Sequence, residues 1–157
     1  MTHTDAAATV IAAEPEAVFA ALVDAGARAV WLPPTGMTGR FEWFDARTGG
    51  GYRMVSTYDD ASEVGKSGGN EDVADVRFAV VEAPHRVVEE VDFVSDDPAF
   101  AGTMTMTWAV EPIEAGSRVT VTATDVPDGI SSADHAVAFA STLANLDAYL
   151  RGSAPAG

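Results

Sequence analysis

Strict alternation between polar and apolar residues is the feature that most restricts how this chain can fold. In "TMTMTWAVE", residues 103–111, every second residue is apolar, and these include Met104, Met106 and Trp108. The segment "VTVTATD", residues 119–125, repeats the pattern. A period of two is typical of strands in a sheet that has one face in solvent and one face covered. The chain must therefore supply an element that covers the apolar face.

A long closing helix, predicted over residues 132–151, supplies that cover. Its apolar residues recur at intervals of three and four, which places them on one side of a helix. Ser131 or Ser132 can cap its N-terminus, and Asp134 favours the positive end of the helix dipole. The residues on that side are His135, Phe139, Leu143, Leu146 and Leu150.

The remaining segments complete an α+β architecture. A first strand is predicted over residues 4–12, a helix over residues 14–26 with Gly26 as its stop, and a short helix over residues 27–32 before Pro33. The expected fold is a curved antiparallel sheet of about seven strands wrapped around the long C-terminal helix. The other six strands are expected to pair as hairpins, at residues 38–45, 51–58, 73–82, 86–94, 102–111 and 117–126.

Length and composition narrow the classes of protein. The 157 residues favour a single domain over residues 1–157, with an ordered core at about 4–151 and a mobile tail at 152–157. The absence of cysteine excludes disulfides, thiolate metal sites and cysteine nucleophiles. The three histidines lack metal-ligand spacing, so neither a metal nor a cofactor is predicted.

The charge balance argues against two kinds of partner. A net charge of −15 disfavours nucleic acid and anionic membranes, because both are bound through basic surfaces. The first residues, "MTHTDAAATVIAAEPE", lack the basic region and apolar run of a signal peptide. A cytoplasmic location is therefore expected.

The glycine run Gly49–Gly51, flanked by Arg47 and Arg53, invites comparison with a phosphate-binding loop. Such a loop needs Gly-x-x-x-x-Gly-Lys-Ser/Thr at the start of a helix, whereas a predicted strand follows here. The segment "GKS", residues 65–67, fails too, because Asp60 stands where the first motif glycine is required. The glycines are therefore predicted to turn the chain between two strands.

A sheet curved around one helix tends to leave a gap, and the residues expected to face it form a candidate ligand site. For the large apolar side chains, packing in an ordinary core is an equal alternative. Tyr52, Arg47 and His135 are the polar side chains expected to orient a ligand. The apolar candidates are Trp31, Trp43, Met54, Phe78, Met104, Met106, Trp108 and Phe139.

Two of the polar candidates have structural alternatives. Asp45 and Arg47 are two residues apart on a strand, so both side chains leave the same face. An ion pair that steadies the turn is favoured over a charged lid on the cavity. His135 is favoured as a partly buried histidine bonded to a neighbouring strand or loop, and the alternatives are a polar anchor at the cavity mouth or a general acid–base.

Four stretches carry a resemblance to a known family. They are "EPEAVFAALVD", "WLPP", "FDARTGGGYRM", and "GSRVTVTATDVPDG" followed by "HAVAFASTLANLDAYL". In this order they resemble the START-like superfamily (SRPBCC, Bet v 1-like), and within it the group of activator of heat-shock protein 90 ATPase homologues and polyketide-cyclase-like proteins. The resemblance implies a helix-grip fold with an internal cavity. Ala138 and Phe139 stand where the family often has Gly-Trp, which changes the shape of that cavity.

Three functions remain in competition, because a fold does not fix a function. The leading hypothesis is binding of an apolar or aromatic small molecule in the cavity. The second is a cyclase or hydratase acting on a polyketide-like substrate, with His135 as its catalytic candidate. The third is a chaperone-regulating interaction module, which the scarcity of basic residues disfavours. The expected partner is a hydrophobic small molecule, and self-association into a homodimer stays open.

Overall fold

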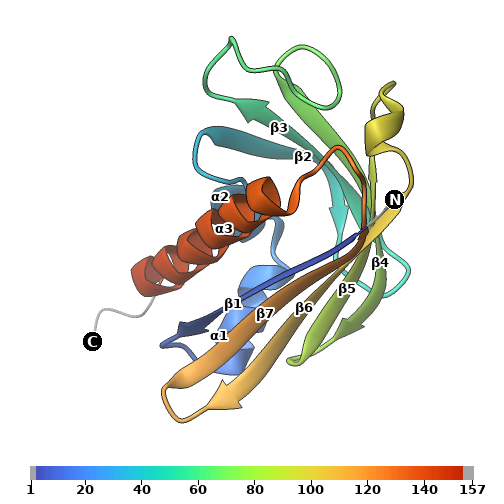
Figure 1. Cartoon of the computed structure of the whole chain (residues 1–157). Coiled ribbons are helices and arrows are strands. Elements are labelled where there is room, and N and C mark those ends of the chain that lie inside the picture. Colours follow the sequence, from blue (N-terminus) through green and yellow to red (C-terminus); the bar gives the residue numbers. More distant parts are fainter. Residues whose placement is uncertain (1–2, 154–157) are drawn as a thin grey trace.

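The computed structural model describes residues 3–153, as a curved sheet with three helices on one side (Figure 1). The long helix α3 lies along the concave side of the sheet, and α1 and α2 lie on that side as well. In chain order the elements are β1 (His3–Ile11), α1 (Pro15–Leu22), α2 (Ala25–Trp31), β2 (Met37–Asp45), β3 (Gly51–Tyr58), β4 (Glu71–Glu82), β5 (Arg86–Phe93), the short 3-10 helix η1 (Pro98–Phe100), β6 (Thr103–Ile113), β7 (Gly116–Val126) and α3 (Ser132–Ser153).

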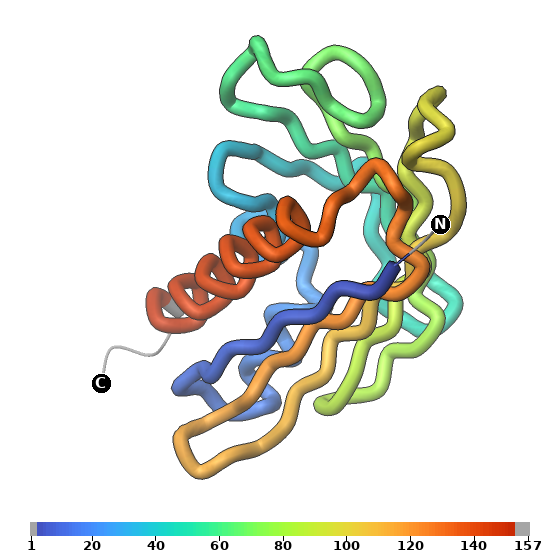
Figure 2. Tube along the Cα trace, viewed as in Figure 1, coloured from blue at the N-terminus to red at the C-terminus, as the bar shows by residue number. Residues whose placement is uncertain are grey.

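The sheet of the described part has seven strands in the order β1-β7-β6-β5-β4-β3-β2. Every neighbouring pair is antiparallel. Five of the six pairs are hairpins of consecutive strands, and the first strand closes the sheet beside the last one, as the chain trace shows (Figure 2). This is the α+β helix-grip arrangement that the sequence predicts.

The alternating segments are strands whose apolar residues face the closing helix. Met104 and Trp108 in β6 and Val119 and Val121 in β7 are all buried. They pack in one core with residues of α3. The five residues predicted to lie on the covered side of α3 are all buried, which confirms that prediction. They are His135, Phe139, Leu143, Leu146 and Leu150.

The first helix is shorter than predicted. It ends at Leu22, and Gly26 lies inside α2 rather than at the stop of α1. The reason is Asp24, whose side chain accepts a hydrogen bond of 2.8 Å from the backbone N–H of Ala27 and so begins a new helix.

The closing helix α3 is longer than predicted. α3 continues to Ser153, so residues 152 and 153 of the predicted mobile tail are helical, and residues 154–157 lie outside the described residues. Within residues 3–153, no helix has the length and apolar character needed to cross a membrane.

The glycine run forms the turn between β2 and β3, as predicted. Gly49 has φ +89°, a conformation that favours glycine. A Cβ atom on Gly51 would lie 2.1 Å from the carbonyl oxygen of Val76 on the neighbouring strand. The glycines therefore allow a positive φ and a close approach of two strands.

Candidate functional site

A cavity of about 780 Å³ lies between the concave face of the sheet and α3. The sheet contributes apolar side chains from β3 to β6, and α3 contributes His135, Ala138, Phe139 and Thr142. The strands supply these side chains because inward positions alternate along each of them. The apolar wall includes Met54, Val76, Val91, Phe93, Met104, Met106 and Trp108.

The mouth of the cavity is formed by loops at one end of the sheet. The loop between β3 and β4, the η1 segment and the connection from β7 to α3 all lie at this end (Figure 1). Lys66 in the first loop donates to Asp72 at 2.8 Å. Its ammonium nitrogen lies 5.3 Å from the ring centre of Phe93 and 5.8 Å from that of Phe100. The lysine therefore ties this loop to the aromatic rim of the mouth.

A buried polar triad, Arg28, Tyr52 and Glu89, lies beneath the cavity. Arg28 Nη2 and Glu89 Oε1 form an ion pair at 2.5 Å. The Tyr52 hydroxyl accepts from Arg28 Nη1 at 3.1 Å and donates to Glu89 Oε2 at 3.2 Å. Tyr52 and Glu89 line the cavity, whereas Arg28 stands behind them. The triad thus presents a carboxylate and a phenol to the interior.

The surroundings of Arg28 stabilise its charge. The guanidinium lies 5.4 to 5.6 Å from the ring centres of Trp31, Tyr52 and Phe78, and its Nε donates to the carbonyl of Leu22. Burial alone would lower the pKa of Arg28, but Glu89 and Tyr52 offset it and raise that pKa. Burial and the Glu89 charge also raise the pKa of Tyr52 far above its ordinary range, so the phenol stays neutral.

A second polar pair, His135 and Asp5, lies between the start of α3 and β1. His135 Nδ1 lies 2.7 Å from Asp5 Oδ2, and both side chains are buried. A carboxylate only accepts, so Nδ1 carries the proton and Nε2 is the basic nitrogen of the neutral ring. Burial lowers the pKa of His135 and outweighs the opposite effect of Asp5. The neutral imidazole is therefore the main form of His135 at pH 7, and this side chain lines the cavity.

Burial raises the pKa of Asp5, but other groups outweigh this effect. Hydrogen bonds from Ser132 and His135 and the nearby His135 and His3 rings bring the net pKa below its ordinary value. His3 Nε2 lies 2.9 Å from Asp5 Oδ2. Asp5 is therefore a carboxylate at neutral pH and can hold the His135 ring in one orientation.

Trp108 has an unusual indole. Its Nε1 atom is buried and has no hydrogen-bond partner among the described residues, although the side chain lines the cavity. Its ring lies edge-on to that of Trp31, with 5.3 Å between ring centres. A buried N–H without an acceptor is rare in proteins, because the lost hydrogen bond to water is not replaced.

Seven of the predicted site residues line the cavity, and two more stand directly behind it. Trp31 donates from Nε1 to the carbonyl of Ala21 at 3.0 Å and supports Trp108. Phe78 packs against Tyr52, with 5.6 Å between ring centres. Trp31 and Phe78 are thus core residues that position the lining. The seven lining residues are Tyr52, Met54, Met104, Met106, Trp108, His135 and Phe139.

The structure places Trp43 outside the cavity, which corrects the prediction. A bulge in β2 shifts the register, so that Phe41 pairs with Met54 but Trp43 pairs with Arg53. One extra residue moves the following side chain to the opposite face of the sheet. Trp43 consequently faces solvent, with 51% of its surface exposed, and Phe44 takes the inner position opposite Tyr52.

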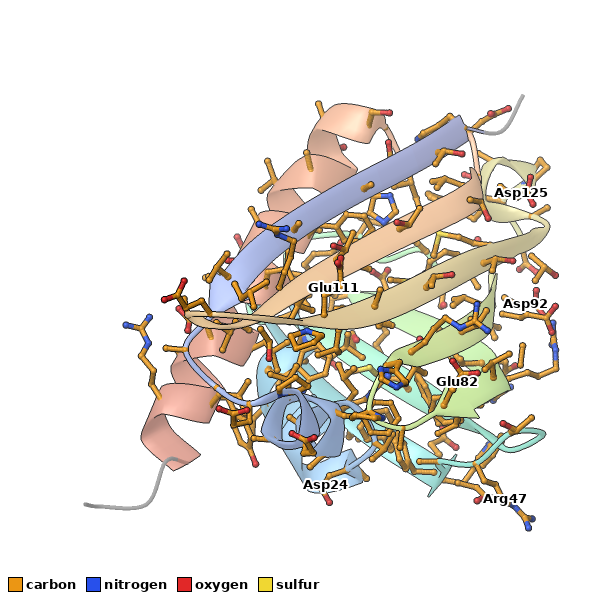
Figure 3. The ribbon with its side chains drawn as sticks, turned by 90° about the horizontal axis from the view of Figure 1, so that it is seen from below. Asp24, Arg47, Glu82, Asp92, Glu111 and Asp125 are labelled. Carbon is orange, nitrogen blue, oxygen red and sulfur yellow. The ribbon has the colours of Figure 1, made fainter. Side chains whose placement is uncertain are left out.

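Arg47 is also outside the cavity. Its Nε donates to Asp45 Oδ2 at 2.8 Å, and its side chain is 78% exposed. Figure 3 shows it pointing away from the body of the fold. The ion pair that the spacing favours is present, and the charged lid is not, because the turn carries the side chain away from α3.

Arg28, Glu89 and Asp5 are site residues that the sequence reasoning missed. Glu89 carried a signal, because it stands between the buried Val87 and Val91 at an inward position of β5. An acidic residue at a position where the strand otherwise has inward-facing apolar residues needs a buried partner. Nothing in the spacing pairs Arg28 or Asp5 with residues so distant in the chain.

A sheet wrapped around a closing helix, with a largely apolar cavity between them, defines the chain as a START-like protein. The profile of the family described as "Activator of Hsp90 ATPase homolog 1-like protein" matches residues 12–151. The chain belongs to this family. No curated protein matches the chain.

Several solved structures share this fold. A Chromobacterium violaceum protein is 26% identical, with a TM-score of 0.84 and coverage of 94% of this chain and 96% of that one. The AHSA1 protein of Silicibacter pomeroyi is 21% identical, with a TM-score of 0.78 and coverage of 97% and 100%. DynU16, a putative protein in the dynemicin biosynthetic locus, is 18% identical with a TM-score of 0.70; the match covers 97% of this chain and 48% of DynU16. The last two likenesses concern the fold alone.

Proposed function

We propose that this protein binds an apolar or aromatic small molecule in the cavity between α3 and the sheet. The observation that carries the proposal is a cavity of about 780 Å³ lined by aromatic and methionine side chains, with the Tyr52–Glu89 pair at its inner end. Ligand sites of about 300–1,000 Å³ with a mostly apolar lining and few polar groups are typical of small-molecule binding proteins. The driving force is burial of apolar ligand surface, at roughly 25 cal/mol per Å².

Two further features support the proposal. Met54, Met104 and Met106 line the cavity, and methionine adapts its shape to different ligands. The structural neighbour DynU16 belongs to a biosynthetic locus, a setting that fits a role with small molecules.

The test is native mass spectrometry of freshly purified protein, followed by extraction and identification of any co-purifying small molecule. A complex whose mass exceeds that of the chain by a small organic molecule is expected. The proposal would be abandoned if the purified protein neither carries such a molecule nor binds any apolar probe that fits the cavity.

A second function is favoured by the Asp5–His135 pair, namely catalysis of a cyclase or hydratase type on a polyketide-like substrate. His135 is neutral, oriented by a carboxylate and placed on the cavity wall, which are requirements of a general base. The expected result is that His135→Ala abolishes turnover of a genuine substrate while the substrate still binds. If turnover were unchanged in that variant, the catalytic proposal would be wrong and only the binding function would stand.

A further inference from the structure

Glu89 has unused hydrogen-bonding capacity at the inner end of the cavity. The residue is 1% exposed and lines the cavity. Its Oε1 faces Arg28, and its Oε2 accepts from Tyr52. A carboxylate offers about four lone-pair positions. Glu89 can therefore accept one more hydrogen bond from a group in the cavity.

Trp108 offers the complementary donor nearby. In the β5–β6 register Glu89 is opposite Met106, so Trp108, two residues further along β6, is its diagonal neighbour on the same face. Its buried indole N–H has no acceptor within the described part of the chain. A hydroxyl group both donates and accepts. One ligand hydroxyl can thus donate to Glu89 and accept from Trp108.

The charges around the cavity disfavour an anionic ligand. Among the described lining residues, the loops, the start of β4 and the start of α3 contribute one ammonium, Lys66, against four carboxylates: Asp72, Asp96, Asp97 and Asp134. Arg28 cannot receive an anion, because its guanidinium nitrogens already contact Leu22, Tyr52 and Glu89. A carboxylate or phosphate would meet negative charge both at the mouth and at Glu89.

We infer that the cavity selects a neutral apolar molecule bearing a hydroxyl group, which binds between Glu89 and Trp108. This inference rests on the proposed function and specifies the chemistry of its ligand. The remainder of the ligand contacts the methionine and aromatic wall. The triad has a defined role in this arrangement: Arg28 and Tyr52 hold the Glu89 carboxylate in place.

A series of naphthalene probes tests the inference by fluorescence titration of the whole protein. 2-Methylnaphthalene forms no hydrogen bond, 2-methoxynaphthalene only accepts, and 2-naphthol both donates and accepts. We expect 2-naphthol to bind at least about tenfold more tightly than 2-methoxynaphthalene, since the added hydrogen bond is to a charged acceptor. The anion 2-naphthoate is expected to bind most weakly, and Asp96→Asn with Asp134→Asn to strengthen its binding.

Two variants assign the two hydrogen bonds. The native protein should bind 2-methoxynaphthalene more tightly than 2-methylnaphthalene, because the ether oxygen accepts from the Trp108 N–H. Trp108→Phe should remove this difference, and Trp43→Phe, on the outer face, is its matched control. Because Glu89→Leu alone would leave Arg28 buried and unpaired, the double variant Arg28→Met with Glu89→Leu is used. It should bind 2-naphthol and 2-methoxynaphthalene equally.

The outcomes separate the two proposals. If 2-methoxynaphthalene binds the native protein as tightly as 2-naphthol, or if 2-naphthoate binds best, the hydroxyl inference is wrong while small-molecule binding stands. If none of the four probes binds and the purified protein carries no small molecule, both proposals are wrong.

Discussion

The imidazole of His135 and the carboxylate of Asp5 lie 2.7 Å apart, although 130 positions separate them in the chain. The contact joins the first strand to the first turn of the closing helix, so it links the two ends of the fold. It also orients the His135 ring on the cavity wall.

The pH dependence of stability is expected to report this pair. Because burial lowers the pKa of His135, the unfolded chain binds the proton more readily than the folded protein. When the pH is below the ordinary histidine pKa of about 6.5, the unfolded state therefore binds more protons than the folded state. The stabilising contribution is present above that pKa and is lost as pH falls toward the lower pKa of the folded state.

Asp5 acts with the same sign at lower pH. Its pKa in the folded state is below the ordinary value, so its contribution is lost as pH falls through that lower pKa. We expect His135→Asn to show a smaller loss of stability than the native protein between about pH 7 and about pH 5, in urea unfolding. His85→Asn, at an exposed turn, is the control. Equal pH slopes for the native protein and His135→Asn would contradict the assignment.

The buried ion pair gives a prediction about stability. Arg28→Leu leaves the Glu89 charge buried without its partner and should lower the free energy of unfolding by about 3–5 kcal/mol. The double variant Arg28→Met with Glu89→Leu removes both charges and should recover most of that loss. Urea denaturation measures all three proteins. A double variant as unstable as Arg28→Leu would show that the triad is not an isolated charge pair.

The cavity can be filled from α3. Ala138 lines it, so Ala138→Trp should place an indole in the space and weaken binding of 2-naphthol by at least about tenfold. Little change in the unfolding midpoint is expected, because the side chain enters a void rather than a packed core. Ala136→Trp on the exposed side of α3 is the matched control. Unaltered 2-naphthol affinity in Ala138→Trp would place the binding site elsewhere.

The glycine turn offers a comparison of two neighbouring positions. Gly49→Ala places a Cβ in open space at a positive φ and should cost about 1–2 kcal/mol. Gly51→Ala should cost more, because its Cβ would overlap the carbonyl of Val76 and push β3 from β4. Thermal unfolding of the two variants ranks them. The opposite order would mean that the strands separate easily at this end.

Arg47 is expected to be dispensable. Its ion pair with Asp45 is exposed, and such pairs contribute at most about 1 kcal/mol. Arg47→Ala should therefore leave 2-naphthol affinity unchanged and shift the unfolding midpoint only slightly. A clear loss of 2-naphthol affinity in Arg47→Ala would mean that the turn is part of the binding site.

The fold was largely predictable from the sequence because its signals are local. Alternation in residues 103–111 and 119–125 defined two strands and their inner faces, and the apolar side of residues 132–151 defined the covering helix. The boundary of α1 was not predictable in the same way. Asp24 as a cap overrode the expected stop at Gly26.

The candidate site was predictable in its apolar wall and in two polar residues, Tyr52 and His135, but not in the buried partners of those two. The alternation of polar and apolar residues correctly predicted that Met104, Met106 and Trp108 lie on the cavity wall. The same reasoning was wrong for Trp43, because a bulge in β2 turns its side chain to the outer face of the sheet. The pairing of Arg28 with Glu89 is a contact between segments that are distant in the chain. From the sequence alone, an arginine on a short helix is expected to face solvent. Long-range polar pairs therefore need the three-dimensional structure.

Lys66 has a practical consequence beyond the loop it anchors. It is the one lysine of the chain, and it stands at the rim of the cavity with its side chain 21% exposed. Amine-directed reagents such as acylating dyes thus have a single side-chain target, next to the opening. The rate at which Lys66 is acylated can serve as a covalent reporter of whether the opening is occupied.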